Sequence, residues 1–305
     1  MANTKKSKGH KETTKWVLPL VFLLAAVLLF GIIYSASSGG IKKLIGQFNS
    51  SNTAQGDEFI VLRFIDVGQG DSTLIELPDG KIVLVDAGPA LSSLVLEAYI
   101  DSLGHNRIDY LIATHPHEDH IGGMAAIITK YDIGEIWAPK VAHNTRTYEL
   151  FLDAVKNKGL SLNTATAGKT IYSEADCSIK VLYPKNDTST EDPNNWSVIL
   201  LVEFGGVSIL LTGDADSSFI SSVYNKKIDV LKVSHHGSYR GTDIDLVRKL
   251  KPESAIISCA TDNPHGFPHK EVLEALRDIS VYRTDIHGTI VVISNGRDLK
   301  TEWGF

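Results

Sequence analysis

The stretch THPHEDHIGG (114–123) places three histidines and two acids within positions 115–120, directly after the apolar run IDYLIA. The apolar run predicts a β-strand, so the polar residues fall in the turn that ends it. Imidazoles and carboxylates at this density are typical of zinc, or of manganese or iron with more oxygen ligands. The four candidate donors are His115, His117, Asp119 and His120. Four donors from one turn cannot all face the same ion, so this turn indicates two adjacent ions.

Two further expected strands end in residues of ligand type. LLTGDAD (210–216) ends in Asp214, whose carboxylate could bridge two ions or could cap the following helix. VLKVSHHGS (230–238) ends in His235 and His236, followed by a glycine that permits close backbone approach. Three strands that end in this way predict that their tips converge on one site.

Strand and helix patterns alternate along residues 58–305. Many expected strands, such as 81–86, 108–114 and 207–212, are nearly continuous apolar runs, which is typical of sheets covered on both faces. Helical patterns fall between them, for example at 121–131. We expect an α/β fold of two sheets between helices, with the polar residues gathered along one edge.

The N-terminal part of the chain differs in composition from the rest. Residues 1–15 contain five lysines, and 16–34 carry no charge. A helix of this length, at about 1.5 Å per residue, matches a hydrocarbon core of about 30 Å. We therefore expect a basic cytoplasmic tail (1–15), one transmembrane anchor (16–36), a polar linker (37–57) and a domain outside the cell membrane. A cleaved signal peptide, with secretion of the domain, is the alternative.

The charge balance limits how the domain can contact polyanions. The chain has 30 Lys and Arg residues and 36 Asp and Glu residues, and residues 1–39 contain five of the basic residues and one of the acidic residues. The remainder therefore carries a net charge of −10 with neutral histidines. Residues 226–251 are a local exception, with seven basic residues and three acids. Contact with nucleic acid is thus expected to be local.

The two cysteines, Cys177 and Cys259, are too few for a disulfide framework or a thiolate metal site. Each lies in or beside an apolar run, so we expect small core residues. A single bridge between them is the alternative for a domain outside the cell.

The ordered motifs of this chain resemble those of the metallo-β-lactamase superfamily. They are FIDVGQGDSTLIE, LVDAG, THPHEDHIGG, NNWSVILLVEFGGVSILLTGD, LKVSHHGS, NPHGFPHKEVLEAL and HGTIVV. The resemblance covers roughly residues 58–305 and is greatest to the hydrolase domain of ComEC-type competence proteins and to their free-standing relatives. It implies an αββα sandwich with two divalent ions, zinc or manganese, at one edge.

The resemblance also implies a ligand set. His115 and His117 correspond to ligands of the first ion, and Asp119 and His120 to ligands of the second. Asp214 corresponds to the bridge between the ions. His236 is expected to complete the second ion, with His235 facing the substrate, although this pair could be exchanged.

Further residues are expected to support the ligands or the chemistry. Asp86 and Asp71 are expected to hold ligand histidines through hydrogen bonds. Catalysis is expected to involve Asp119, His235 and His269. The element NPHGFPH resembles one that the family has near its metal site, so Asn263 and His269 are expected to touch substrate or to donate a proton. Packing at a helix start is the alternative for His269.

One position departs from the lactamase pattern. Related hydrolases place a further histidine on the first ion where this chain has PNNWS, so Asn194 or Asn195 takes that place. The competence proteins share this substitution. An amide oxygen is a weaker ligand than imidazole, so the first ion is expected to bind loosely or to be manganese. His143 is an alternative ligand, or a residue of a surface loop.

Two such ions would lower the pKa of a shared water and neutralise the charge of a phosphate diester. We therefore expect a metal-dependent phosphodiesterase that acts outside the membrane, and the resemblance points to single-stranded DNA. The enzyme alternatives are an esterase for a wall polymer such as choline-decorated teichoic acid, and a β-lactamase, which the missing histidine disfavours. A DNA-binding module for DNA uptake is the alternative without turnover. No protein partner is assigned.

Overall fold

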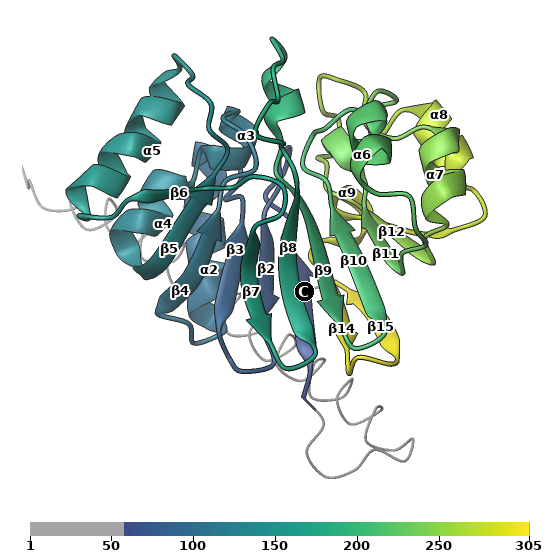
Figure 1. Cartoon of the computed structure of the whole chain (residues 1–305), viewed down its shortest axis with the longest axis horizontal. Coiled ribbons are helices and arrows are strands. Elements are labelled where there is room, and N and C mark those ends of the chain that lie inside the picture. The colour runs from purple at the N-terminus through teal and green to yellow at the C-terminus, as the bar shows by residue number, and fades with distance from the viewer. Residues whose placement is uncertain (1–57, 305) are drawn as a thin grey trace, which may run out of the picture.

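The computed structural model describes residues 58–304, which form two mixed β-sheets packed face to face, with helices on their outer faces (Figure 1). The predicted tail, anchor and linker lie outside the described residues. Within 58–304, no helix combines the length and the hydropathy that a membrane span requires.

The described strands fall into an eight-stranded and a seven-stranded sheet. The first sheet contains, in spatial order, β15 (Leu299–Trp303), β14 (Ile290–Ser294), β1 (Ile60–Phe64), β2 (Thr73–Glu76), β3 (Ile82–Val85), β4 (Arg107–Ile112), β5 (Asp132–Ala138) and β6 (Leu162–Thr164). The second contains β13 (Ser280–Arg283), β12 (Ser254–Ile257), β11 (Val230–Lys232), β10 (Val207–Leu211), β9 (Ile199–Phe204), β8 (Cys177–Tyr183) and β7 (Thr170–Glu174).

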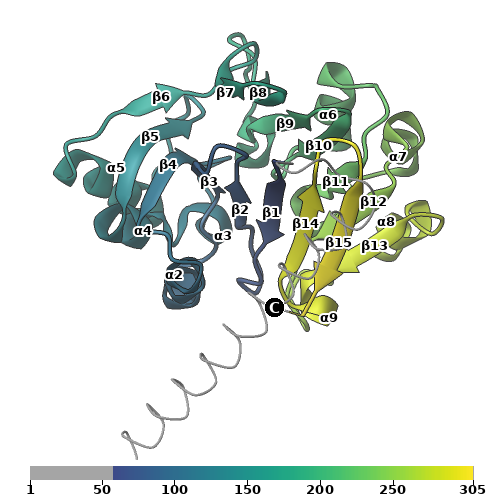
Figure 2. The ribbon, with the colours of Figure 1, turned by 90° about the horizontal axis from the view of Figure 1, so that it is seen from below.

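The helices cover both outer faces (Figure 2). Those on the first sheet are α2 (Ser93–Ser102), α4 (Met124–Lys130) and α5 (Arg146–Asn157). Those on the second are α6 (Ser217–Val223), α7 (Ile244–Leu250) and α8 (Lys270–Ala275). The short helices are η1 (Ala90–Ser92), α3 (Glu118–Ile121), η2 (Pro193–Trp196), η3 (Ser234–Gly237) and α9 (Thr284–His287).

The apolar residues of the strands form three layers of core. Between the sheets, Phe64 and Ile112 of the first sheet share a cluster with Leu200 of the second, all fully buried. The other two clusters lie between each sheet and its helices. This explains the continuous apolar runs, because central strands bury both faces. Cys177 and Cys259 are buried and free, as expected of core residues.

The strand directions place the polar turns at one edge. β3, β4 and β5 run parallel in the first sheet, and β10, β11 and β12 run parallel in the second. The carboxyl ends of these strands therefore meet at the edge near α3, at the top of Figure 1.

The helix expected at 121–131 is present as α4 (Met124–Lys130), but it begins later than expected, and Ile121 belongs to α3 instead. α3 ends at Ile121 and α4 begins at Met124, with Gly122 and Gly123 between them. A Cβ on Gly123 would lie 2.3 Å from the carbonyl oxygen of Ala87. The break thus lets the loop after β3 pack directly against the histidine turn.

The first sheet carries a charge cluster whose contribution to stability depends on pH. Glu76 forms an ion pair with the buried Arg63, and His105 Nε2 lies 2.8 Å from its carboxylate. Burial raises the pKa of Glu76, but the His105 hydrogen bond and the Arg63 charge outweigh it, so the pKa falls below its usual 4.5. A lowered folded-state pKa gives stability that is present above the unfolded value and lost as pH falls.

We expect Glu76→Gln to destabilise the domain near neutral pH and to do so progressively less below about pH 4.5. Urea unfolding of both proteins at several pH values measures the difference in the free energy of unfolding. A difference that is independent of pH would contradict this account.

Candidate metal centre

The turn after β4 supplies the first pair of donors. His115 is buried, and its Nε2 lies 3.0 Å from Nδ1 of His117. Thr114 Oγ1 lies 3.1 Å from the other nitrogen of His115. An imidazole held at one nitrogen presents the other to the site, as a metal-ligating histidine does.

The same turn supplies two donors of a second group. Asp119 and His120 lie on α3, which begins directly after His117. His236, in the turn after β11, has its Nε2 3.1 Å from Asp119 Oδ2. One ligand atom each of Asp119, His120, Asp214 and His236 lies within 4.8 Å of the others.

Asp214 lies between the two groups. Its Oδ1 is 3.3 Å from His120 Nε2, and its Oδ2 is 3.6 Å from His236 Nε2 and 3.8 Å from His115 Nε2. The side chain is 2% exposed. A carboxylate in this position could contact an ion in either group, and its role as the bridge stays a prediction.

The unpaired atoms of this cluster fit a pair of cations. His120 Nε2 and Asp214 Oδ1 are buried, and neither forms a hydrogen bond despite their 3.3 Å separation. Buried polar atoms without partners cost free energy, so they indicate a group that completes them. Histidine nitrogens and carboxylate oxygens are donors that zinc and manganese accept. The first ion would lie with His115, His117 and Asp214, and the second with Asp119, His120, Asp214 and His236.

Without cations, burial and the neighbouring charges shift the pKa values of these histidines and carboxylates. Burial lowers the pKa of His236, but Asp214, Asp119 and Asp71 outweigh it and raise the pKa to about 10. Burial raises the pKa of Asp214, but His120 and His236 outweigh it and hold that pKa well below its usual value. Burial holds the pKa of His115 well below its usual value.

Asp86 supports the histidine turn from the end of β3. Its carboxylate accepts hydrogen bonds from the backbone N–H of Thr114 at 2.8 Å and from Thr114 Oγ1 at 2.6 Å. It also lies 2.7 Å from His120 Nδ1. Asp86 therefore fixes the ring of His120 with Nε2 directed toward Asp214.

We expect Asp86→Asn to weaken metal binding by about 10- to 100-fold. An amide has only one acceptor oxygen, so it cannot accept the hydrogen bonds of both Thr114 and His120 as the two carboxylate oxygens do. Isothermal titration with Zn²⁺ or Mn²⁺ checks this. Asp176→Asn, in the exposed turn between β7 and β8, is the control and should bind metal as the wild type does.

Asp71 supports His236 and is paired with a buried lysine. Asp71 Oδ1 lies 3.4 Å from His236 Nδ1, and Lys232 Nζ donates to Asp71 Oδ2 at 2.8 Å. His236 Nδ1 also contacts the backbone oxygen of Ser258 at 3.0 Å. Two strands of the second sheet and the turn after β1 thus orient one imidazole.

His235 and His236 occupy a strained turn. Both have left-handed backbone conformations, with φ of 52° and 54°. Such conformations cost ~1–3 kcal/mol each in non-glycine residues and concentrate at functional sites. His235 Nε2 lies 3.7 Å from Asp214 Oδ2, and its side chain is 19% exposed. His235 therefore lies at the mouth of the cluster, while His236 is buried within it.

The PNNWS segment separates its two asparagines. The Asn195 amide is fully engaged with Asp216: its oxygen accepts from the Asp216 N–H at 2.9 Å and its nitrogen donates to the carboxylate at 3.1 Å. Asn194 Oδ1 is buried without a partner. Ser197 Oγ lies 3.3 Å from His115 Nδ1 and accepts from the Asp214 N–H at 2.9 Å. Of the two amides, Asn194 is the one with a free oxygen.

The remaining predicted residues lie on the rim. The ring of His143 is 6.0 Å from that of His117, and its Nδ1 contacts Thr145 Oγ1 at 3.1 Å. The amide of Asn263 bonds only within its own loop, to the backbone of residues 260, 265 and 267. His269 is the N-cap residue of α8, and its Nδ1 accepts from the backbone N–H of Tyr239 at 3.2 Å.

Several basic residues of the stretch 226–251 are buried or paired with acids, and local contact with nucleic acid stays a prediction. Lys232 is buried, although it had counted as one of the seven basic residues. Lys227 pairs with Glu253, and Arg240 pairs with Asp192 and Asp216.

The roles of Lys232 and Ser197 were not predicted from the sequence. A lysine inside the apolar run VLKV was the available signal for the first of these.

Two sheets between helices, with histidines and carboxylates at the strand ends, define a metal-dependent hydrolase fold. The chain belongs to the metallo-β-lactamase superfamily, whose family model matches residues 65–261. The resemblance to competence proteins is confirmed: ComE operon protein 3 of Bacillus subtilis is 33% identical over 252 residues, covering 74% of this chain and 32% of that protein. Recombination protein 2 of Haemophilus influenzae is 32% identical over 235 residues, covering 74% of this chain and 27% of that protein.

The chain therefore spans about a third or less of these curated relatives. Among solved structures, the metallo-β-lactamase fold protein YhfI of Bacillus subtilis is 14% identical, with a TM-score of 0.53 over 78% of this chain and 100% of that one. This likeness shows the fold alone.

Proposed function

We propose that this protein is a phosphodiesterase that cleaves single-stranded DNA with the aid of two divalent ions, Zn²⁺ or Mn²⁺. The observation that carries the proposal is the position of Asp214. Its Oδ1 lies 3.3 Å from His120 Nε2, and its Oδ2 lies 3.8 Å from His115 Nε2 and 3.6 Å from His236 Nε2, so the carboxylate reaches both groups of donors. The relative named Recombination protein 2 supports DNA as the substrate.

When bound, the two ions would lower the pKa of a water and neutralise the charge of the phosphate. Side chains of the protein hold the ligands in the positions that this chemistry requires. Asp214 fixes the separation of the two groups, and Asp86 and Asp71 fix the rings of His120 and His236. His235, at the mouth, is placed to donate a hydrogen bond to a phosphate or leaving oxygen.

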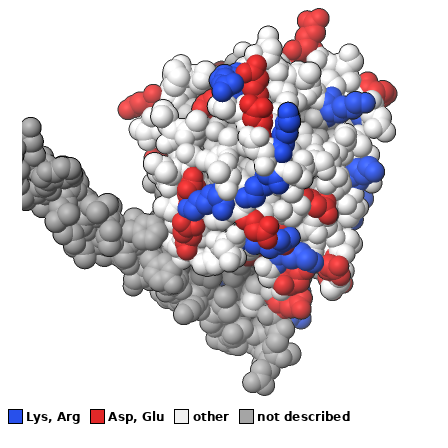
Figure 3. All heavy atoms as spheres, turned by 90° about the vertical axis from the view of Figure 1, so that its left-hand side faces the viewer, with Lys and Arg blue, Asp and Glu red and all other residues white. Residues whose placement is uncertain are grey.

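The charges of the surface favour recognition at the site over recognition by the whole domain. On the face that α4 and α5 form, basic and acidic side chains are interspersed (Figure 3). Several of them are paired, such as Lys130 with Glu97 and Asp101. A long polyanion gains little from such a surface, so its phosphate must be held mainly at the metal centre.

We further propose that residues 16–36 anchor the domain in the cell membrane and that catalysis takes place outside. The lysines that precede the uncharged stretch support this orientation. Protease treatment of intact cells tests it: digestion of the domain is expected, and full protection would place the domain inside.

The test of activity uses the full chain with Mn²⁺ or Zn²⁺ and three substrates: labelled single-stranded DNA, bis-p-nitrophenyl phosphate and a chromogenic cephalosporin. Cleavage of the first two is expected, with loss in His117→Ala and retention in His287→Gln, a histidine of α9 outside the cluster. Turnover of the cephalosporin alone would overturn the proposal. DNA binding without cleavage of any substrate would favour a binding module.

A further inference from the structure

Aromatic side chains form a row that leads outward from the metal centre. The Phe267 ring lies 5.5 Å from that of His235 and 6.3 Å from that of His236. Beyond it, His265 stacks on Phe267 at 5.2 Å, and His269 lies 5.0 Å from Phe267. Tyr239 completes the row, 5.0 Å from His269. We call Tyr239, His265, Phe267 and His269 the aromatic row.

The outer members of the row face solvent. Tyr239 is 58% exposed, and His265 is also exposed. Phe267 and His269 are half-buried between them and the ligand histidines. Core packing does not explain these rings, because two of them are exposed and the other two are only half-buried.

Backbone contacts hold the row in a fixed shape. The His269 N–H donates to the carbonyl oxygen of Gly237 at 2.9 Å, and the Tyr239 N–H donates to His269 Nδ1. A Cβ on Gly237, whose φ is +88°, would lie 2.4 Å from Cβ of Pro268. The turns after β11 and β12 are thus locked together, and a planar ligand would meet a preorganised surface.

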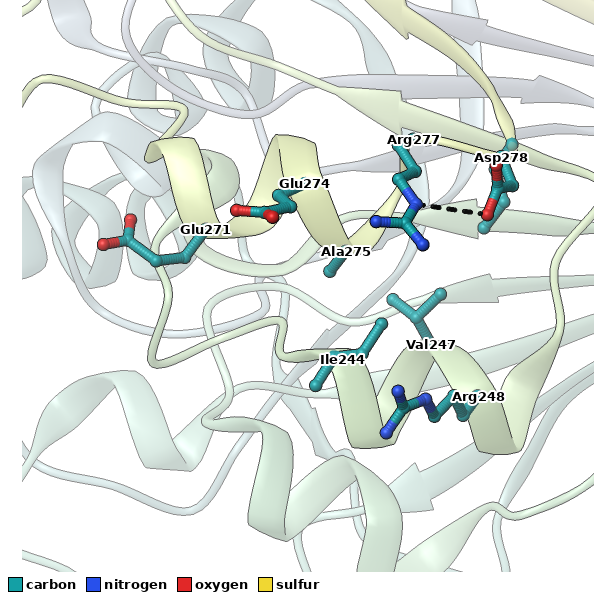
Figure 4. Close-up of a pocket in the computed structure, with 9 residues that line it drawn as sticks. Ile244, Val247, Arg248, Glu271, Glu274, Ala275, Arg277 and Asp278 are labelled. Carbon is teal, nitrogen blue, oxygen red and sulfur yellow. Dashed lines mark hydrogen bonds and ion pairs between the residues drawn. The ribbon is translucent and has the colours of Figure 1, made fainter.

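A cleft of about 520 Å³ lies between α7 and α8, the helix that follows His269 (Figure 4). The cleft carries charges of both signs, so it does not offer a cationic surface for holding a strand. Arg248 and Arg277 line this cleft together with three acids, Glu271, Glu274 and Asp278. Among these, Arg277 pairs with Asp278. A polyanion gains little there, so stacking is the stronger attraction on this side of the site.

We propose that the aromatic row stacks the bases of a single strand whose phosphate lies at the metal centre, a proposal that rests on the proposed function. Every base has a π-face, so such a surface accepts strands of any sequence. Bases within a duplex are already stacked on their neighbours and are not available to it. The row therefore selects single-stranded over double-stranded DNA.

The test measures binding of phosphorothioate oligonucleotides to the metal-loaded chain, so that the ions still hold the strand while cleavage is suppressed. Fluorescence anisotropy compares a single-stranded oligonucleotide with an abasic oligonucleotide of the same length. The wild-type chain is expected to bind the strand with bases more tightly. Tyr239→Ala should weaken that binding by about 5- to 150-fold, which corresponds to ~1–3 kcal/mol, and should leave abasic binding unchanged.

Two variants serve as controls. Tyr239→Phe keeps the ring and should bind as the wild type does. Trp303→Ala removes an equally exposed ring on β15, outside the row, and should have no effect. Equal binding of both oligonucleotides, or unchanged binding in both Tyr239→Ala and His265→Ala, would overturn the proposal.

The outcomes also separate the two proposals. Binding that depends on the aromatic row, without cleavage of any phosphodiester, supports the stacking role of the row and overturns the proposed phosphodiesterase activity. Cleavage of the unmodified forms of both oligonucleotides at equal kcat/KM, unaltered by Tyr239→Ala, supports the hydrolase and overturns the row.

Discussion

Asp214→Asn should lower kcat/KM for a phosphodiester by about 10³-fold or more. The substitution keeps the shape of the side chain but removes the charge that both groups of donors share. Neutralisation of developing charge by the ions contributes several kcal/mol, and each 1.36 kcal/mol corresponds to about tenfold in rate. Steady-state kinetics with bis-p-nitrophenyl phosphate measures the loss.

The same variant should also bind fewer ions per chain, which elemental analysis of the dialysed protein measures. Asp176→Asn is the control for both measurements, because it removes a carboxylate from an exposed turn. Activity within about tenfold of the wild type in Asp214→Asn would exclude the bridging role.

Lys232→Met is expected to be the most destabilising single change outside the ligands. Lys232 and Asp71 form an ion pair at 2.8 Å with side chains only 3% and 7% exposed. Removal of one partner leaves the other charge buried, which costs ~3–5 kcal/mol. For a domain of this size, the melting temperature should fall by roughly 10 °C.

Thermal unfolding of the metal-free protein checks this prediction. Lys249→Met, on the exposed face of α7, is the matched control and should change stability by less than about 0.5 kcal/mol. Asp71→Leu together with Lys232→Met should recover part of the loss, because no unpaired charge remains. An unchanged melting temperature in Lys232→Met alone would show that the pair contributes nothing.

The sequence predicted the parts of the fold in which one physical effect dominates. The central strands β4, β10 and β11 are rich in apolar residues, and the ligand-type residues that follow each of them meet at one edge. Parallel strands made this convergence predictable, because their carboxyl ends lie on the same side. Strands such as β7 (TIYSE) and β15 (LKTEW) mix polar and apolar residues at the margins of the sheets and gave no such signal.

Other features depended on tertiary contacts that no local pattern contains. The engagement of the Asn195 amide depended on Asp216, which leaves only Asn194 of the pair with an unbonded amide oxygen. The burial of Lys232 depended on Asp71, which lies 161 positions away in the sequence. The break between α3 and α4 depended on the carbonyl of Ala87, which Gly123 alone can approach.

Electron paramagnetic resonance of the full chain, loaded with Mn²⁺, tests the central claim most directly. If the tips of β4, β10 and β11 hold two ions with Asp214 between them, the ions should lie ~3.5–4 Å apart and their spins should be exchange-coupled. The account predicts a coupled spectrum at full loading, lost in Asp214→Asn. A spectrum of isolated Mn²⁺ at full loading of the wild type would contradict it.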